Sequence, residues 1–290
     1  MGIDIFGLDV LYLLMLMGVG MCAGFINAMA FGGSMLTVPT LIYLIPYALN
    51  ISSIPFAIIH IYSPTQIPQA LNISSLTTNL ANGTNRVAIF FQNLSAILGY
   101  RRKGVSNFRH AIVLTIPAVV GAGIGAFIGT ETPDRAFKPI LAVVMMTILF
   151  LTFFNPTEWL HQKINPSGTQ YKIITSIVLF IVGIYGGFIQ IGTGLLIIAT
   201  LQILDGEDLV ITNAHKVFII FFYTIIALVI FVSKGQVNWV LGLTLATGNA
   251  TGAWIGSHFA VKMGDKWIKV VLVIAVIASV TKLLWDTFKF

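Results

Sequence analysis

The chain has 290 residues, of which 57% are hydrophobic and only 9% are charged. Soluble domains carry about 25% charged residues, so this composition excludes an ordinary soluble protein and predicts an all-α integral membrane protein. The net charge of +6 does not indicate a nucleic-acid partner, because many basic residues cluster in short loops, as membrane topology requires. The single cysteine excludes an internal disulfide.

Apolar runs of about 20 residues, the length that spans a bilayer, recur along the whole chain. Two shorter runs, 34–47 and 194–205, follow glycine clusters at 31–34 and 191–194. We expect a broken helix or hairpin at each cluster, at mid-membrane, where irregular backbone must be buried in protein or line a polar cavity. The predicted spans are 8–30, 81–100, 108–130, 136–154, 172–190, 211–233, 237–259 and 267–286.

The uncharged, proline-containing segment 48–80 interrupts this pattern. We interpret it as an external insertion with a short helix on the membrane surface. The alternative is that Gln66 and Gln69 enter the mouth of a transport pathway.

The two halves of the sequence repeat. At an offset of 131 residues, Lys103-Gly104 matches Lys234-Gly235, and the glycine ladder 121–129 matches the ladder 248–256. We expect the ladders to serve close helix packing. The predicted domains are a first transmembrane repeat (1–154), a cytoplasmic linker (155–171) and a second repeat (172–290).

The distribution of basic residues predicts the orientation. About five membrane segments per half make the two repeats inverted, an arrangement typical of secondary transporters. Loops near 101–109, 155–172 and 260–269 then lie on one side with nine basic residues, against five on the other. Because cytoplasmic loops carry the excess of Lys and Arg, this side is predicted to be cytoplasmic.

Each half contains one cation within apolar sequence, Arg86 in the first and Lys216 in the second. The acidic residues lie near the ends of apolar stretches or in loops, so neither cation has an evident carboxylate partner. A buried charge without a partner is costly, and an ionisable group inside the membrane indicates a functional site. We therefore predict that a bound anion compensates both charges. The alternative for Lys216 is that it extends to the membrane surface.

The glycine breaks predict a second set of anion ligands. A helix that restarts after a break exposes free backbone N–H groups and a partial positive charge. Side chains beside the breaks add hydroxyl and amide groups, and we expect them in the same substrate site: Asn27, Ser34, Thr37, Gln190, Thr193 and Gly194. The alternative is that the glycines only allow close packing.

Amide side chains accompany each cation at helical spacing, with Asn82 and Asn85 beside Arg86, and Asn213 beside Lys216. We place them in the substrate site; the alternative is that they join helices by hydrogen bonds. His215 is a candidate for proton coupling, although a lone histidine also occurs in satisfied hydrogen-bond networks. No catalytic constellation, metal-ligand spacing or cofactor motif is present, so we predict neither an enzyme nor a bound metal.

These residues resemble the signatures of the TauE/SafE sulfite exporter family. The similarity rests on segments 24–39 and 83–104 in the first half and on 185–194 and 213–216 in the second, and it covers nearly the whole chain. The resemblance implies a multi-pass permease of the bacterial inner membrane that moves sulfite or an organosulfonate. The departures are Phe31 and Ser34, where the family has more glycine, and the long 48–80 segment.

The leading hypothesis is a secondary transporter that exports sulfite or a related small sulfur oxyanion by alternating access around a cationic mid-membrane site. The alternatives are a passive anion channel, an organosulfonate uptake permease and a membrane scaffold that transports nothing. The lipid bilayer is an expected partner, and both a monomer and a homodimer are compatible with the sequence.

Overall fold

The computed structural model describes residues 4–5, 8–29, 37–38, 40–41, 73–105, 108–133, 136, 140, 169–205 and 208–263. The predicted span 267–286 and the first glycine cluster lie outside the described residues, as do the predicted span 136–154 apart from residues 136 and 140 and the predicted linker 155–171 apart from residues 169–171. Residues 169–171 belong to α9. The helices are α1 (Val10–Met29), α5 (Ile73–Arg102), α6 (Arg109–Glu131), α9 (Thr169–Phe188), α10 (Thr193–Asp205), α11 (Leu209–Ser233) and α12 (Trp239–Met263). A short antiparallel pair, β1 (Asp4–Ile5) and β2 (Leu8–Asp9), precedes α1.

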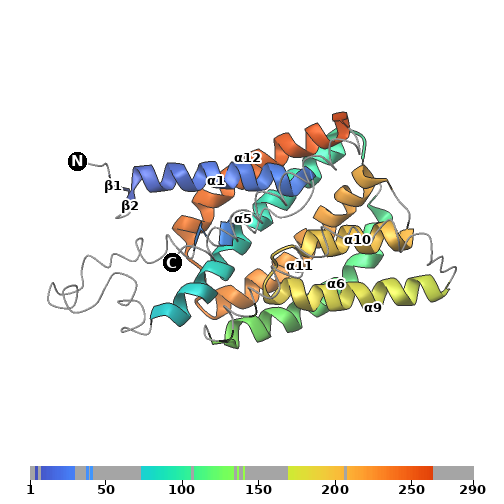
Figure 1. The fold of residues 1–290 in the computed structure, drawn as a ribbon, viewed down its shortest axis with the longest axis horizontal. Coiled ribbons are helices and arrows are strands. Elements are labelled where there is room, and N and C mark those ends of the chain that lie inside the picture. Colours follow the sequence, from blue (N-terminus) through green and yellow to red (C-terminus); the bar gives the residue numbers. More distant parts are fainter. Residues whose placement is uncertain are drawn as a thin grey trace, which may run out of the picture.

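The helices of the two halves interleave. Helix α1 lies along α12, and α9 lies along α6, while α5 and α11 cross between these two pairs (Figure 1). Helix α5 packs on α12, and α11 packs on α6. Since α1, α5 and α6 come from the first half and the others from the second, each of these contacts joins one half to the other.

Glycines allow the outer pairs to approach backbone to backbone. A Cβ on Gly125 of α6 would lie 1.8 Å from the carbonyl oxygen of Ile184 on α9, and one on Gly252 of α12 would lie 2.0 Å from that of Met21 on α1. Such distances are impossible for a real side chain, so the packing role expected for the two ladders is confirmed.

The ends of α5 and α11 have the same backbone geometry at an offset of 131 residues. Gly104 and Gly235 both have positive φ, 88° and 68°, which glycine adopts without steric cost. The N–H of Val105 donates to Tyr100 O at 3.1 Å, and the equivalent N–H of Gln236 donates to Phe231 O at 3.0 Å. The sequence similarity is therefore accompanied by equal local structure.

The outward faces of the helices are apolar. Helix α6 exposes a row of large aliphatic and aromatic side chains: Ile112, Val113, Ile116, Val120, Ile124 and Phe127. By length and composition, α6 and α11 are long and apolar enough to cross a membrane, and shorter apolar helices lie at 13–29, 172–188 and 193–204. The polar residues of α5 are instead turned inward, where Asn82, Asn85 and Arg86 are buried.

The predicted start of α5, and therefore the predicted place of Arg86 along the helix, are wrong. The helix begins at Ile73, so residues 73–80, assigned to the external insertion, belong to it. Helix α5 is about 45 Å long at 1.5 Å per residue, and Arg86 lies near its middle rather than near its start. The sequence analysis missed this first part of the helix because its Ser, Thr and Asn residues between 73 and 80 lower the mean hydropathy.

Alanine at Gly125 is expected to destabilise the protein, whereas alanine at Gly123 is not. The Cβ at position 125 would overlap the backbone of α9, but at position 123 its nearest neighbour is a flexible Ile226 methyl group at 3.6 Å. Thermal unfolding in detergent should show a clear decrease for Gly125→Ala and little change for Gly123→Ala. Equal unfolding temperatures for the two variants would contradict the close α6–α9 contact.

Candidate functional site

Arg86 binds the C-terminal end of a helix from the other half. Its side chain is fully buried, and the guanidinium lies over the Phe231 ring at 4.5 Å from the ring centre. Its Nη1 donates to Gly186 O and to Gln190 Oε1, both at 3.3 Å. Its Nη2 donates to the carbonyl oxygens of Gly187 and Phe188. These carbonyls belong to the last turn of α9 and have no partner within that helix.

Lys216, in the second half, binds the C-terminal end of a helix in the first half. It lies on α11, is fully buried, and its Nζ donates to the backbone oxygen of Asn27 at 2.7 Å. Asn27 lies in the last turn of α1, so a cation of the second half binds a helix end of the first. Nζ also donates to Asn213 Oδ1 at 2.7 Å, which places the predicted amide partner directly beside the lysine.

These contacts correct one premise of the sequence analysis. Burial of both cations is confirmed, but their partners are the C-terminal ends of helices, so a bound anion is not required to explain why the cations are buried. The negative end of a helix dipole favours a cation at this position. Among the described residues, Arg86 forms no ion pair with a carboxylate.

Two amides of α5 extend the contacts around Arg86. Asn82 donates through Nδ2 to Phe188 O at 2.8 Å, and Asn85 Oδ1 accepts the hydroxyl hydrogen bond of Thr37 at 2.6 Å. Within the described part of the chain, Asn85 Nδ2 and Arg86 Nε are buried donors that lack an acceptor. The predicted ligand Ser34 lies outside the described residues.

The backbone between α9 and α10 turns sharply beside Arg86. Helix α9 ends at Phe188 and α10 begins at Thr193, and between them Gln190 and Gly192 have φ angles of 67° and 70°. A positive φ is uncommon for a residue other than glycine. The hydroxyl of Thr193 donates to Gln190 O at 2.9 Å, and Gln190 Nε2 donates to Thr224 Oγ1 at 3.0 Å. These bonds hold Gln190 in its strained conformation.

A small cavity lies where the two helix ends approach each other. Polar groups from both halves reach it, namely Asn27 of α1, Gln190 and Tyr223, together with the α10 residue Gly194. The complete lining is Asn27, Ile89, Gln190, Gly192, Gly194, Ile220 and Tyr223. The structure thus brings three of the predicted site residues, Asn27, Gln190 and Gly194, to one cavity. Arg86 and Lys216 bind the helix ends beside it.

His215, the predicted proton carrier, has a neighbour that the sequence analysis missed. The ring centres of His215 and His110 are 6.0 Å apart, and that of Phe108 is 6.4 Å from His215. His110 lies at the start of α6, beside a basic loop, and its position in the sequence does not indicate a contact with His215. Only the packing of α6 on α11 brings the two histidines together.

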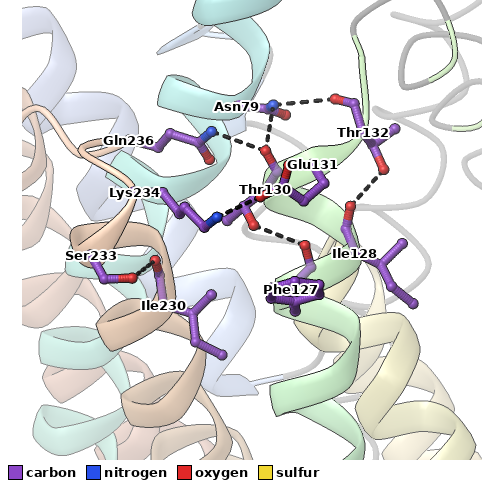
Figure 2. Close-up of polar contacts among 10 residues, drawn as sticks. All are labelled: Asn79, Phe127, Ile128, Thr130, Glu131, Thr132, Ile230, Ser233, Lys234 and Gln236. Carbon is purple, nitrogen blue, oxygen red and sulfur yellow. Dashed lines mark hydrogen bonds and ion pairs between the residues drawn. The ribbon is translucent and has the colours of Figure 1, made fainter.

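A polar cluster at the ends of α6 and α11 was also missed. It contains Asn79, Thr130, Glu131, Lys234 and Gln236 (Figure 2). Asn79 could have been found, because it lies seven residues before Arg86 and so shares its helix face. Among the residues that the structure describes, no group of three His, Cys, Asp or Glu side chains could hold a metal ion.

Interleaved helices with lipid-compatible outer faces and buried cations define a helical membrane protein with a polar interior. Comparison with known proteins identifies it further. The family model described as "Sulfite exporter TauE/SafE" matches residues 16–283, and the chain belongs to this family of membrane transporters. The resemblance seen in the sequence is therefore confirmed.

Three curated relatives carry similar names. A "Probable membrane transporter protein ORF9" of Sinorhizobium sp is 29% identical over 91% of this chain and 89% of its own. A "Probable membrane transporter protein" of Haemophilus influenzae is 25% identical over 97% and 96%. The "Probable membrane transporter protein YunE" of Bacillus subtilis is 24% identical over 92% and 96%. No solved structure matches the chain significantly.

Replacing Arg86 by methionine is expected to destabilise the fold strongly. Each buried carbonyl left without a donor costs about 1–3 kcal/mol, and Arg86 donates to the carbonyl oxygens of Gly186 and Gly187. The control is Lys234→Met, which breaks an exposed ion pair with Glu131 and should cost at most about 1 kcal/mol. Thermal unfolding of the purified variants measures both effects. A similar small loss for the two variants would show that Arg86 does not hold the end of α9.

Proposed function

We propose that this chain is a secondary transporter that exports sulfite, or a related small sulfur oxyanion, across the bacterial inner membrane. The family description supports the substrate class, and the names of the relatives support a transporter. The proposed site is the cavity between the end of α1 and the break between α9 and α10.

The charge balance around this cavity is the observation that carries the proposal. A helix C-terminus carries about half a negative charge, so each buried cation keeps about half of its positive charge after binding one. The N-terminus of α10 adds about half a positive charge beside Gly194. The side chains that line the cavity include no carboxylate. A compact anion would therefore be attracted to this position.

The cavity also offers groups that can replace the water around an oxyanion. The hydroxyl of Tyr223 and the amides of Asn27 and Gln190 line it, together with the backbone of Gly192 and Gly194. Sulfite has three acceptor oxygens on one small pyramid, which several convergent donors can bind at once. Hydrogen bonds to a charged oxygen are about twice as strong as neutral ones.

The arrangement of the halves supports alternating access. Asn27 comes from the first half and Gln190 from the second, and the equivalent cation contacts cross between the halves. We infer that the chain is made of inverted repeats that rock against each other about this shared site, as in other transporters built from repeats. His215, with His110 beside it, is the candidate route for a coupled proton.

The variant Tyr223→Phe is expected to transport sulfite with a half-saturating concentration about tenfold higher or more. It removes one hydroxyl from the cavity but keeps the buried ring, and a hydrogen bond to a charged group contributes about 1.5–3 kcal/mol. Uptake of radiolabelled sulfite into proteoliposomes measures the change.

Thr200→Val is the matched control for this loss of a hydroxyl. Thr200 lies on α10, and its hydroxyl donates to Leu196 O of its own helix, away from the cavity lining. Its transport should equal that of the unmodified protein. Unchanged transport in Tyr223→Phe would exclude this cavity as the substrate site, and absence of sulfite transport in the unmodified protein would reject the proposed function.

A further inference from the structure

Glu131 and Lys234 connect the C-terminal ends of α6 and α11 across the two halves. Lys234 Nζ lies 2.5 Å from Glu131 Oε1, and both side chains are partly exposed (Figure 2). Beside this pair, Gln236 Nε2 donates to Thr130 O at 3.0 Å. The end of α11, in the second half, is thus fixed to the end of α6, in the first half, by one charged and one neutral contact.

Helix α5 takes part in the same contact region. Asn79 donates through Nδ2 to Thr132 O at 3.2 Å. The backbone N–H of Asn238, just after Gln236, donates to Thr84 Oγ1 at 2.9 Å. A Cβ on Gly83 would lie 1.9 Å from Gln236 O, so the segment 234–238 packs directly on the α5 backbone. We call the side chains of Asn79, Glu131, Lys234 and Gln236 the latch.

The latch lies on the same face of α5 as Arg86, which binds the helix end beside the proposed substrate site. Asn79 and Arg86 are seven residues apart, which places them two turns apart on one helix face, about 10 Å along the axis. Gly83, on which segment 234–238 packs, lies between them. Segment 234–238 therefore covers the face of α5 that carries Asn79, Gly83 and Arg86.

The opposite end of the molecule has no such ion pair at the equivalent positions. At the offset of 131 residues, Lys234 corresponds to Lys103, and Glu131 corresponds to Lys262. Both lysines are exposed, at the ends of α5 and α12. The two ends thus have similar backbone geometry but differ in charge. Glu131 and Lys234 attract each other at one end, whereas the equivalent positions at the other end both carry lysine. This difference favours closure at the α6–α11 end.

Two hydrogen-bond acceptors of the latch also lack a donor. Within the described residues, Asn79 Oδ1 and Gln236 Oε1 are buried acceptors that receive no hydrogen bond. Opening the latch would expose both oxygens to water, which offsets part of the bonds lost. A contact of this kind can hold one state without preventing its release.

We propose that the latch is the gate on the non-cytoplasmic side of the transporter. This inference rests on the proposed alternating-access function. In the structure the gate is closed, with segment 234–238 of the second half fastened to α5 and α6 of the first. Release of the Glu131–Lys234 pair lets segment 234–238 move away from α5 and α6 at this end and gives the substrate its exit.

A charge swap tests the gate without any substrate. The reporter is Thr130→Cys in a Cys22→Ser background, because the Thr130 side chain is buried beside the latch and bonds to Phe127 O of its own helix. We expect a membrane-impermeant maleimide to label it several-fold faster in Glu131→Lys or Lys234→Glu, where the pair becomes repulsive. The double variant Glu131→Lys with Lys234→Glu restores an ion pair and should return labelling to the background rate.

A second reporter separates gate opening from unfolding. Thr200→Cys lies on α10, away from the latch, and is buried to a similar extent. It should stay unlabelled in every variant. Background labelling in the single variants, fast labelling in the double variant, or labelling of both reporters together would overturn the gate. Failure of sulfite transport by the unmodified protein would instead reject the proposed function, because labelling does not depend on it.

Discussion

The fold depends on two buried cations that each bind the end of a helix in the other half. Arg86 on α5 donates to the last carbonyls of α9, and Lys216 on α11 donates to the last turn of α1. Without a donor, these carbonyls would be unsatisfied inside the protein, which is costly. The same two contacts therefore fix both helix ends, join the halves, and set the position of the cavity that lies between them.

This arrangement explains how the two cations can stabilise the fold and still attract an anion to the cavity. A helix end offsets only part of a full charge, and the start of α10 adds positive potential on the other side of the cavity. Glycines on α6, α9, α1 and α12 let the outer pairs pack closely. The outer helix pairs are thus closely packed around the proposed substrate site, whereas polar side chains join the halves at the α6–α11 end.

Much of this could be predicted from single residues, but not the pairing between distant ones. Arg86 and Lys216 stand out because each is a cation in apolar sequence, and the glycine ladders stand out by their spacing. The partners could not be found this way, because Gly186 is 100 residues from Arg86 and Asn27 is 189 from Lys216. Backbone carbonyls carry no sequence signal, so the sequence analysis predicted a bound anion as the partner of both cations. The contact between His110 and His215 was missed because the two residues lie far apart in the sequence and meet only through the packing of α6 on α11.

Ligand-dependent thermal unfolding of the purified protein tests the central claim most directly. If the cavity between the helix ends binds a sulfur oxyanion, sulfite at 100 times its dissociation constant should add about 2.7 kcal/mol to the free energy of unfolding. The unfolding temperature should rise with sulfite concentration, and it should rise less in Tyr223→Phe. If sulfite, sulfate, thiosulfate and a sulfonate all leave the unfolding temperature unchanged, the positive cavity is not an anion site.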